Sequence, residues 1–292
     1  MARHFFGTWL ALPIASVVLA AAPQAAAYCR TTTCAAAGAQ ANCTRDPVTG
    51  CHAFGAPLFW QQSCVSYSIF VRGSPKLGLD YEQSEALVAS AFAAWPTVAC
   101  ASGFPSIAVT SFGATSCDKV EFNGGGPNAN AVIFRDLEWP HALTQLALTT
   151  VSFDRNTGKI HGADVEINTF GYPLTPAQAQ FILTHEAGHF LGLDHSFDGS
   201  AVMTASYDFF AEPVLAPDDV AAICAAYPPE RPQTECNAEP EDGYAADCGG
   251  NVEGGCTTVT RPVTFGAAAA ALCAAAAAVA LSRRRLRRSE RV

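Results

Sequence analysis

One stretch of the sequence decides both the fold and the chemistry to be expected of this chain. It reads His185-Glu186-Ala187-Gly188-His189-Phe190-Leu191-Gly192-Leu193-Asp194-His195. His185 and His189 are four residues apart, so on a helix their side chains project from the same face. Two imidazoles placed in this way can bind one zinc ion. Glu186 follows the first of them, where its carboxylate can reach a water on the same metal.

Gly192 makes a third metal ligand available. A glycine can leave a helix through a turn with positive φ, which other residues adopt only with strain. That turn would bring His195 back toward His185 and His189. Three protein ligands leave an open position on the metal, which a catalytic zinc needs and a structural zinc does not. The sequence therefore predicts a hydrolytic zinc centre, in which zinc lowers the pKa of a water and Glu186 is the general base.

The residues around the motif predict alternating strands and helices. Thr175 can cap a helix and Pro176 suits its first position, so we expect a helix from there to about Leu191. Helical spacing and breakers predict two more helices, over residues 82–95 and 220–227, of which the second is opened by residues 216–219. Apolar or alternating runs predict strands at residues 64–71, 106–112, 131–135, 146–153 and 159–168, of which the last two form a hairpin.

The turn of this hairpin, from Asp154 to Gly158, raises the question of a second metal. Its Asp-x-Asn-x-Gly pattern offers oxygen ligands that could hold calcium. Such turns more often use these residues because they tolerate a left-handed backbone. Zinc is therefore the cofactor we expect, with calcium as a less favoured addition.

Charge argues against a nucleic-acid partner. The 292 residues are 50% hydrophobic, enough for one sizeable domain with accessory segments. Between Tyr28 and Cys256 there are 9 Lys and Arg against 25 Asp and Glu, a net charge of −16. A body this acidic repels phosphate backbones, so we expect no nucleic-acid binding.

The beginning of the chain and its cysteines indicate export. An apolar run over residues 5–22, followed by Ala25-Ala26-Ala27, is typical of a signal peptide over residues 1–27. The chain has 12 Cys, and ten of them lie between Cys29 and Cys248. An even number in an exported protein predicts disulfides, although the sequence leaves their connectivity open.

Composition divides the rest of the chain into four parts. Residues 28–56 are predicted to be a Cys-rich extension tied by disulfides, and residues 57–228 a catalytic domain. Residues 229–255 are rich in Pro, Gly and acidic residues, which predicts a flexible acidic linker with one small disulfide loop. Residues 256–292 form a tail in which the apolar stretch 262–281 precedes an Arg cluster, a length and charge that suit a membrane anchor.

The extended motif resembles that of the metzincin metallopeptidases, because Met203 follows His195 by eight residues. Ser196 after the third histidine resembles the matrixin branch, the matrix-metalloproteinase-like group. Segments 91–95, 162–168 and 217–220 resemble matrixin segments in the same order. The resemblance covers about residues 57–228, but a matrixin propeptide with its zinc-blocking Cys is not evident. The histidine and aspartate ligands of the matrixin structural zinc are not evident either.

The resemblance implies an α+β metzincin fold. It consists of a twisted mixed sheet with an antiparallel edge strand, an active-site helix and a small C-terminal subdomain. It also implies that Met203 forms a tight turn beneath the zinc. On the edge strand, Ala147, Leu148 and Thr149 match the segment that binds an extended peptide substrate.

The tail has a resemblance of its own. Gly255-Cys256, the apolar stretch and the terminal Arg cluster are similar to C-terminal sorting signals of myxobacterial surface proteins. This implies processing near Cys256 and display at the cell surface or outer membrane, with a plain membrane anchor as the alternative. We expect membrane contact through the tail only, and a monomer.

These observations favour a secreted or surface-anchored zinc endopeptidase that acts on proteins or peptides. A surface binding or adhesion module with a non-catalytic zinc is the alternative from another class. The presence of Glu186 argues against it, since a structural site needs no base. A small-molecule metallohydrolase is a third hypothesis, disfavoured by the order of strands and motifs.

Overall fold

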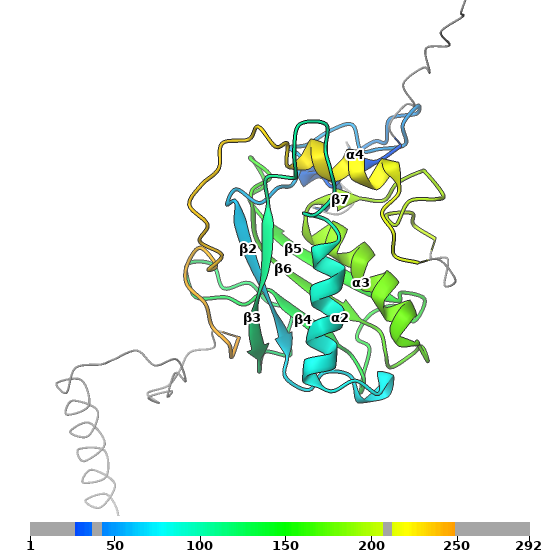
Figure 1. Ribbon diagram of the computed structural model, residues 1–292, viewed down its shortest axis with the longest axis vertical. Helices are drawn as coiled ribbons and strands as arrows, with labels where there is room; N and C mark the ends of the chain where they lie inside the picture. Colours follow the sequence, from blue (N-terminus) through cyan, green and yellow to red (C-terminus); the bar gives the residue numbers. More distant parts are fainter. Residues whose placement is uncertain (1–26, 37–42, 207–211, 249–292) are drawn as a thin grey trace, which may run out of the picture.

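A five-stranded sheet forms the centre of the protein in the computed structural model, which describes residues 27–36, 43–206 and 212–248 (Figure 1). The strands lie in the order β3-β2-β4-β6-β5. Their bounds are β2 Cys64–Phe70, β3 Ala108–Thr115, β4 Ala131–Phe134, β5 Ala147–Phe153 and β6 Ile160–Ile167. The first four in this order are parallel, and β5 pairs antiparallel with β6 at the edge. The predicted mixed sheet with an antiparallel edge strand is confirmed.

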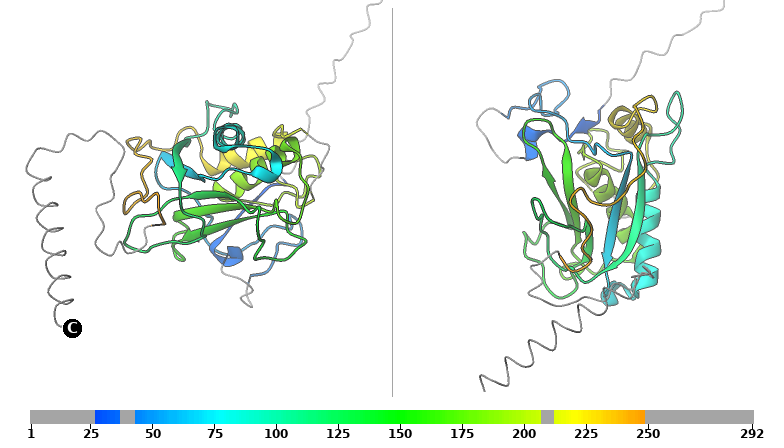
Figure 2. Two further views of the ribbon diagram at one scale, coloured as in Figure 1. Left: turned by 90° about the horizontal axis from the view of Figure 1, so that it is seen from below. Right: turned by 90° about the vertical axis from the view of Figure 1, so that its left-hand side faces the viewer.

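Two long helices cover one face of this sheet (Figure 2). They are α2 Tyr81–Ala93, which follows the short 3-10 helix η1 Pro75–Leu77, and α3 Pro176–Phe190. Each begins with a capping box, in which Asp80 pairs with Gln83 and Thr175 pairs with Gln178. Such boxes satisfy backbone N–H groups that the first turn of a helix leaves unpaired. The start of the motif-bearing helix is therefore where the sequence predicts it.

The end of α3 is held by aromatic side chains from other parts of the chain. Trp60 Nε1 donates to the Phe190 carbonyl at 2.8 Å, and the Tyr227 hydroxyl donates to the Leu191 carbonyl at 2.9 Å. Tyr227 directly follows the last helix, α4 Pro217–Ala226. Carbonyls in the last turn of a helix have no partner within the helix, so these bonds fix the point at which the chain leaves α3.

The N-terminal extension packs against the segment that follows α3. It contains β1 Cys29–Arg30 and α1 Thr33–Ala36, and β1 pairs antiparallel with β7 Leu193–Asp194. The disulfides Cys29–Cys51 and Cys34–Cys43 close it. Disulfides are thus present in this part of the chain, as its cysteines predict.

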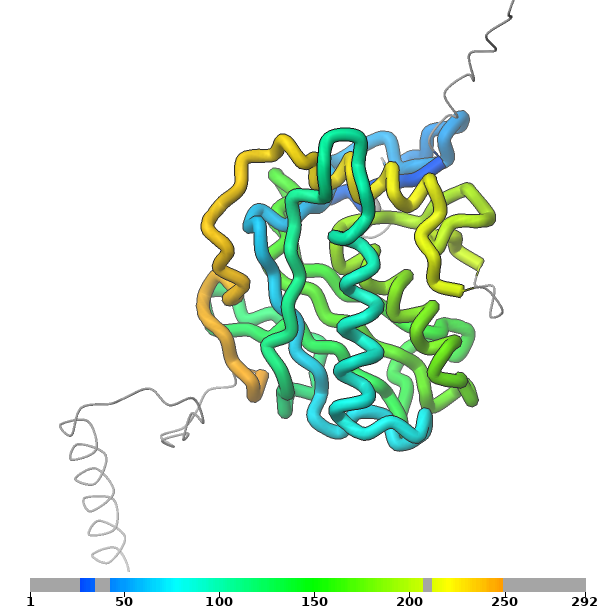
Figure 3. The backbone as a smooth tube through the Cα atoms, viewed as in Figure 1, coloured from blue at the N-terminus to red at the C-terminus, as the bar shows by residue number. Residues whose placement is uncertain are grey.

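Residues 229–248 run along the β2–β3 side of the sheet (Figure 3). The Ser66 hydroxyl donates to the Ala238 carbonyl, and the Thr115 hydroxyl donates to the Ala246 carbonyl. Disulfides Cys64–Cys236 and Cys117–Cys248 attach this segment to the sheet. The predicted small disulfide loop within this segment is wrong. Cys236 bonds to Cys64 in β2, and Cys248 bonds to Cys117, which follows β3. With Cys100–Cys224, all ten cysteines from Cys29 to Cys248 are paired.

The predicted signal peptide, the end of the acidic linker and the tail with Cys256 lie outside the described residues, apart from Ala27. Within the described part of the chain, no helix has the length and apolar character needed to cross a membrane.

Candidate metal centre

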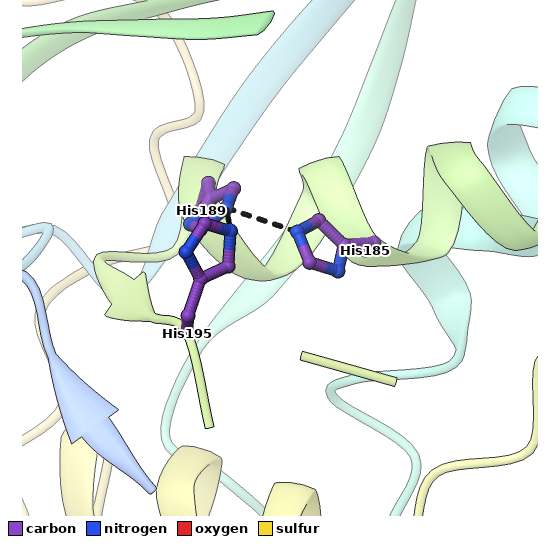
Figure 4. A group of neighbouring side chains, drawn as sticks. All are labelled: His185, His189 and His195. Carbon is purple, nitrogen blue, oxygen red and sulfur yellow. Dashed lines mark hydrogen bonds between the residues drawn. The ribbon is translucent and has the colours of Figure 1, made fainter. Parts of the chain in front are cut away.

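Three histidines meet beside the C-terminal half of α3. His185 and His189 project from one face of this helix, and His195 approaches them from the segment after β7 (Figure 4). His185 Nε2 lies 3.1 Å from His189 Nε2, which lies 3.3 Å from His195 Nε2. One nitrogen of each ring falls within 4.8 Å of the others. The sequence spacing therefore does bring these three side chains together.

In two of these rings the second nitrogen, Nδ1, makes a hydrogen bond to a backbone carbonyl. His185 Nδ1 lies 2.7 Å from the Val202 carbonyl, and His189 Nδ1 lies 2.8 Å from the Leu193 carbonyl. A carbonyl only accepts, so in both rings Nδ1 carries the proton and the neutral ring turns a lone pair on Nε2 inward. This arrangement of outer hydrogen bonds is the one that orients histidine ligands of metals.

Burial favours the neutral form of His185 and His195. It lowers the pKa of His185 well below its usual range. Burial, together with the neighbouring His189, lowers the pKa of His195 to about 4. Neutral imidazoles are the form that binds a metal.

This donor set fits zinc. Zn–N bonds of about 2.0–2.1 Å in a tetrahedral site place the ligand nitrogens roughly 3.3–3.4 Å apart, close to the separations observed. Lone pairs that face one another across about 3 Å repel unless a cation lies between them. In the described residues this is the one cluster of His, Cys, Asp or Glu side chains with metal-ligand geometry.

Glu186 lies in the same cleft, on the turn of α3 that carries the first histidine. Its side chain is 3% exposed, and its Oε2 accepts a hydrogen bond from the Thr149 hydroxyl at 2.6 Å. Thr149 belongs to the edge strand β5, for which the resemblance implies substrate binding. The edge strand therefore also contacts the carboxylate of Glu186.

Met203 lies in a turn next to the first histidine, because the carbonyl of the preceding residue, Val202, contacts the ring of His185. It is 1% exposed, and its N–H donates to Asp219 Oδ1 at 3.1 Å. The N–H of Val202 donates to Asp219 Oδ2 at 2.8 Å, and the Ser196 N–H donates to the Met203 carbonyl at 2.8 Å. One buried carboxylate on α4 thus holds the turn whose Val202 carbonyl orients the first histidine.

Gly192 makes the turn that leads from α3 to His195. Its φ is 84°, and a Cβ atom at this position would lie 2.5 Å from the Leu58 carbonyl oxygen. A side chain is thus excluded by both backbone conformation and space. The extension braces the same turn, since the N–H of Thr31 and the Nε of Arg30 donate to the Gly192 carbonyl at 3.1 and 3.3 Å.

A cleft of about 700 Å³ opens over the histidines. One wall is β5, with Ala147, Leu148 and Thr149 among its lining residues. The extension contributes to the lining as well, through Thr31, Arg45 and His52. The edge strand is thus placed beside the histidines, as the resemblance implies.

The role of several residues at this site was not predicted from the sequence. The side chains of Arg45 and His52 carry no local signal of their role, because they reach the site only through the fold. Asp219 lies in the segment 217–220 noted above, but its bonds to the turn of Met203 become visible only in the structure. Gly188 lies inside the motif, so its contribution to the site could have been predicted from the sequence. The hairpin turn is explained without calcium: Asp154 Oδ1 accepts bonds from the Asn156 N–H, the Thr157 N–H and the Thr157 hydroxyl.

A mixed sheet with a cleft at its antiparallel edge, three converging histidines and a buried glutamate are the features of a metal-dependent hydrolase. The family profile described as Matrixin matches residues 59–228. This match spans more than half of the chain, and the chain belongs to the matrixin family. It is therefore a zinc metalloendopeptidase of α+β fold, and proteins or peptides are its substrates. No curated protein matches this chain.

Proposed function

We propose that this chain is an exported zinc endopeptidase in which His185, His189 and His195 hold the metal and Glu186 is the general base. The convergence of three Nε2 atoms is the observation that carries this proposal. The outer bonds to Val202 and Leu193 support it, because they leave the lone pairs of two rings directed at one point.

Zinc, when bound there, would polarise the scissile carbonyl and lower the pKa of a water from about 15.7 to near 7. Glu186 takes the proton of the attacking water and delivers it to the leaving amine. Thr149 is a positioning residue in this proposal, since its hydroxyl contacts Oε2 of Glu186 and limits the rotation of the carboxylate. The reaction proceeds without a covalent intermediate with the protein.

An extended substrate would bind along β5. Among the described strands it has a neighbour on one side only, and its residues 147–153 are all partly exposed. Edge strands present unpaired N–H and C=O groups, to which a peptide can add as a further strand. Ala147, Leu148 and Thr149 lie where such a peptide would pass the histidines.

Export and surface display belong to the same proposal. The apolar N-terminal run and five disulfides support export, because disulfides persist in oxidising compartments. The sequence around Cys256 and the terminal Arg cluster support anchoring or processing at the cell surface.

The test of the chemistry compares the full chain, produced under oxidising conditions, with its Glu186→Gln variant. Both are incubated with a mixed peptide library, and their zinc content is measured. Because general-base catalysis contributes roughly 10²–10⁴-fold, we expect the variant to lose that much of kcat while it retains zinc.

The outcomes separate the competing functions. Cleavage by the parent and loss in the variant at equal zinc content support the proposal. Equal cleavage by both would remove Glu186 from the role of base. Bound zinc without cleavage by either protein would contradict the proposed activity and favour the binding module.

A further inference from the structure

Residues 44–53 of the extension form a hairpin that stands beside the metal centre. Arg45 and His52 face each other across it as an antiparallel bridge, and Cys29–Cys51 ties it to β1. The hairpin also packs on the segment after His195, where Gly50 lies against the ring of Phe197 so closely that a Cβ atom would come within 2.5 Å of it. The hairpin is therefore held at a fixed place relative to the third histidine.

Arg45 brings a positive charge into the cleft. Its Nη1 donates to the Gly50 carbonyl at 2.8 Å, a bond across the hairpin that restrains the guanidinium. Arg45 lines the cleft together with the three histidines and Glu186, and it is the one Lys or Arg among the described residues that do so.

The described part of the protein gives this charge no carboxylate partner within 4.0 Å. Two carboxylates line the same cleft, those of Glu186 and Asp194. Oε2 of Glu186 accepts from Thr149, and Oδ1 of Asp194 accepts from the His195 N–H at 2.8 Å. Arg45 therefore has guanidinium N–H donors available beside the place where a substrate would lie.

The body of the chain is acidic, with 9 basic against 25 acidic residues between Tyr28 and Cys256. An acidic substrate is repelled by most of this surface, so a single cation in the cleft decides where a substrate carboxylate can be accepted. An arginine suits this task because its planar fork matches a carboxylate.

We propose that Arg45 forms a specificity subsite that binds an aspartate or glutamate side chain of the substrate close to the scissile bond. This inference rests on the proposed function, because it uses the same cleft. It assigns to the extension a part in substrate choice.

The test uses the full chain loaded with zinc and pairs of fluorogenic peptides built on a sequence that it cleaves. Within a pair, one position near the cleaved bond carries Glu in one peptide and Gln in the other. The readout is the Glu-to-Gln ratio of kcat/KM for each position. We expect one position in the parent to favour Glu by roughly two- to fivefold, the range of an exposed ion pair.

Four variants complete the experiment. Arg45→Gln is expected to bring the ratio at that position to about one. Arg45→Glu should reverse it, and Arg45→Lys should retain a preference for Glu. Arg155→Gln is the matched control, since it removes one exposed arginine from the turn between β5 and β6 without touching the cleft lining, and it should keep the ratio of the parent.

The results are distinguishable from a failure of the proposed function. A parent that cleaves peptides but favours Glu at no position overturns the subsite alone. The subsite is also overturned if Arg45→Gln keeps the parent's preference for Glu. If the parent cleaves no peptide at all while it holds zinc, the proposed activity fails and the subsite fails with it.

Discussion

Gly188 lies between the two helical histidines, and at this position the absence of a side chain shapes the metal centre. A Cβ atom there would lie 2.3 Å from Met203 Sδ and 2.8 Å from Trp95 Cζ2. Both neighbours are buried, and Trp95 Nε1 is bonded to the Thr184 carbonyl. The glycine therefore lets the turn of Met203 pack directly against α3.

Replacing Gly188 with alanine should destabilise the protein, although the same change within an exposed helix stabilises by about 1 kcal/mol. Overpacking at Met203 and Trp95 should cost about 1–3 kcal/mol in the free energy of unfolding. Urea unfolding measures this difference. Gly199→Ala, where a Cβ atom meets nothing within 4 Å, is the control. A Gly188→Ala variant as stable as the parent would show that the contact relaxes freely.

At the scale of elements, the short strand β1 supports the segment of the third histidine from outside the residues that match the matrixin profile. It pairs with β7, and Thr31 Oγ1 donates to the Leu193 carbonyl at 2.9 Å. The same carbonyl faces His189 Nδ1 at 2.8 Å. The extension therefore contacts the carbonyl that orients His189 and pairs with the strand that precedes His195, and Cys29–Cys51 holds it in place. Each of its described cysteines is in a disulfide, so no thiol of this part is free to block the metal.

Loss of the Cys29–Cys51 bond should therefore weaken metal binding. For the Cys29→Ser, Cys51→Ser double variant we expect zinc affinity to fall roughly 10–100-fold, the size of effect seen when outer-shell partners are lost. Competition with a chelator of known affinity measures it. The Cys34→Ser, Cys43→Ser variant is the matched control, because it removes a disulfide of the same extension without freeing β1. Equal zinc affinity in both double variants would argue against the bracing role.

At the scale of the whole molecule, one buried carboxylate couples stability to pH. Asp164 on β6 accepts from the Ala131 N–H of β4 at 2.7 Å and from the Glu121 N–H at 3.2 Å. Burial raises the pKa of Asp164 to about 7. The folded state therefore binds a proton that the unfolded state has released between about pH 4 and pH 7. The contribution of Asp164 is present at low pH and is lost as the pH rises through 7.

The Asp164→Asn variant should lack this dependence. Between pH 5 and pH 8 the stability of the parent relative to the variant should fall, with a slope of at most about 1.4 kcal/mol per pH unit. Urea unfolding of the metal-free proteins measures the difference, and the pH dependence of the histidines cancels between them. The exposed Asp118→Asn should follow the parent. A constant difference across this range would show that Asp164 is ionised in the folded protein.

Which features of this protein could be predicted from the sequence depends on how far apart in the chain the interacting residues lie. The capping residues Thr175 and Gln178, the alternating strands and the spacing of His185 and His189 act within a few residues, and the sequence predicted all of these features. Residues 229–248 show the limit of such reasoning. Their composition is that of a flexible linker, yet Cys236 and Cys248 bond to cysteines far earlier in the chain.

The sequence by itself determined the class of fold, the helix with its histidines and the positive-φ turn at Gly192, because backbone preference and periodicity are local properties. Only the tertiary structure decided which side chains surround the metal centre. Asp219 reaches the turn of Met203, Thr149 reaches Glu186, and Arg45 reaches the cleft across long sequence separations. Such contacts depend on the packing of the sheet, α4 and the extension against one another. No local pattern in the chain encodes them.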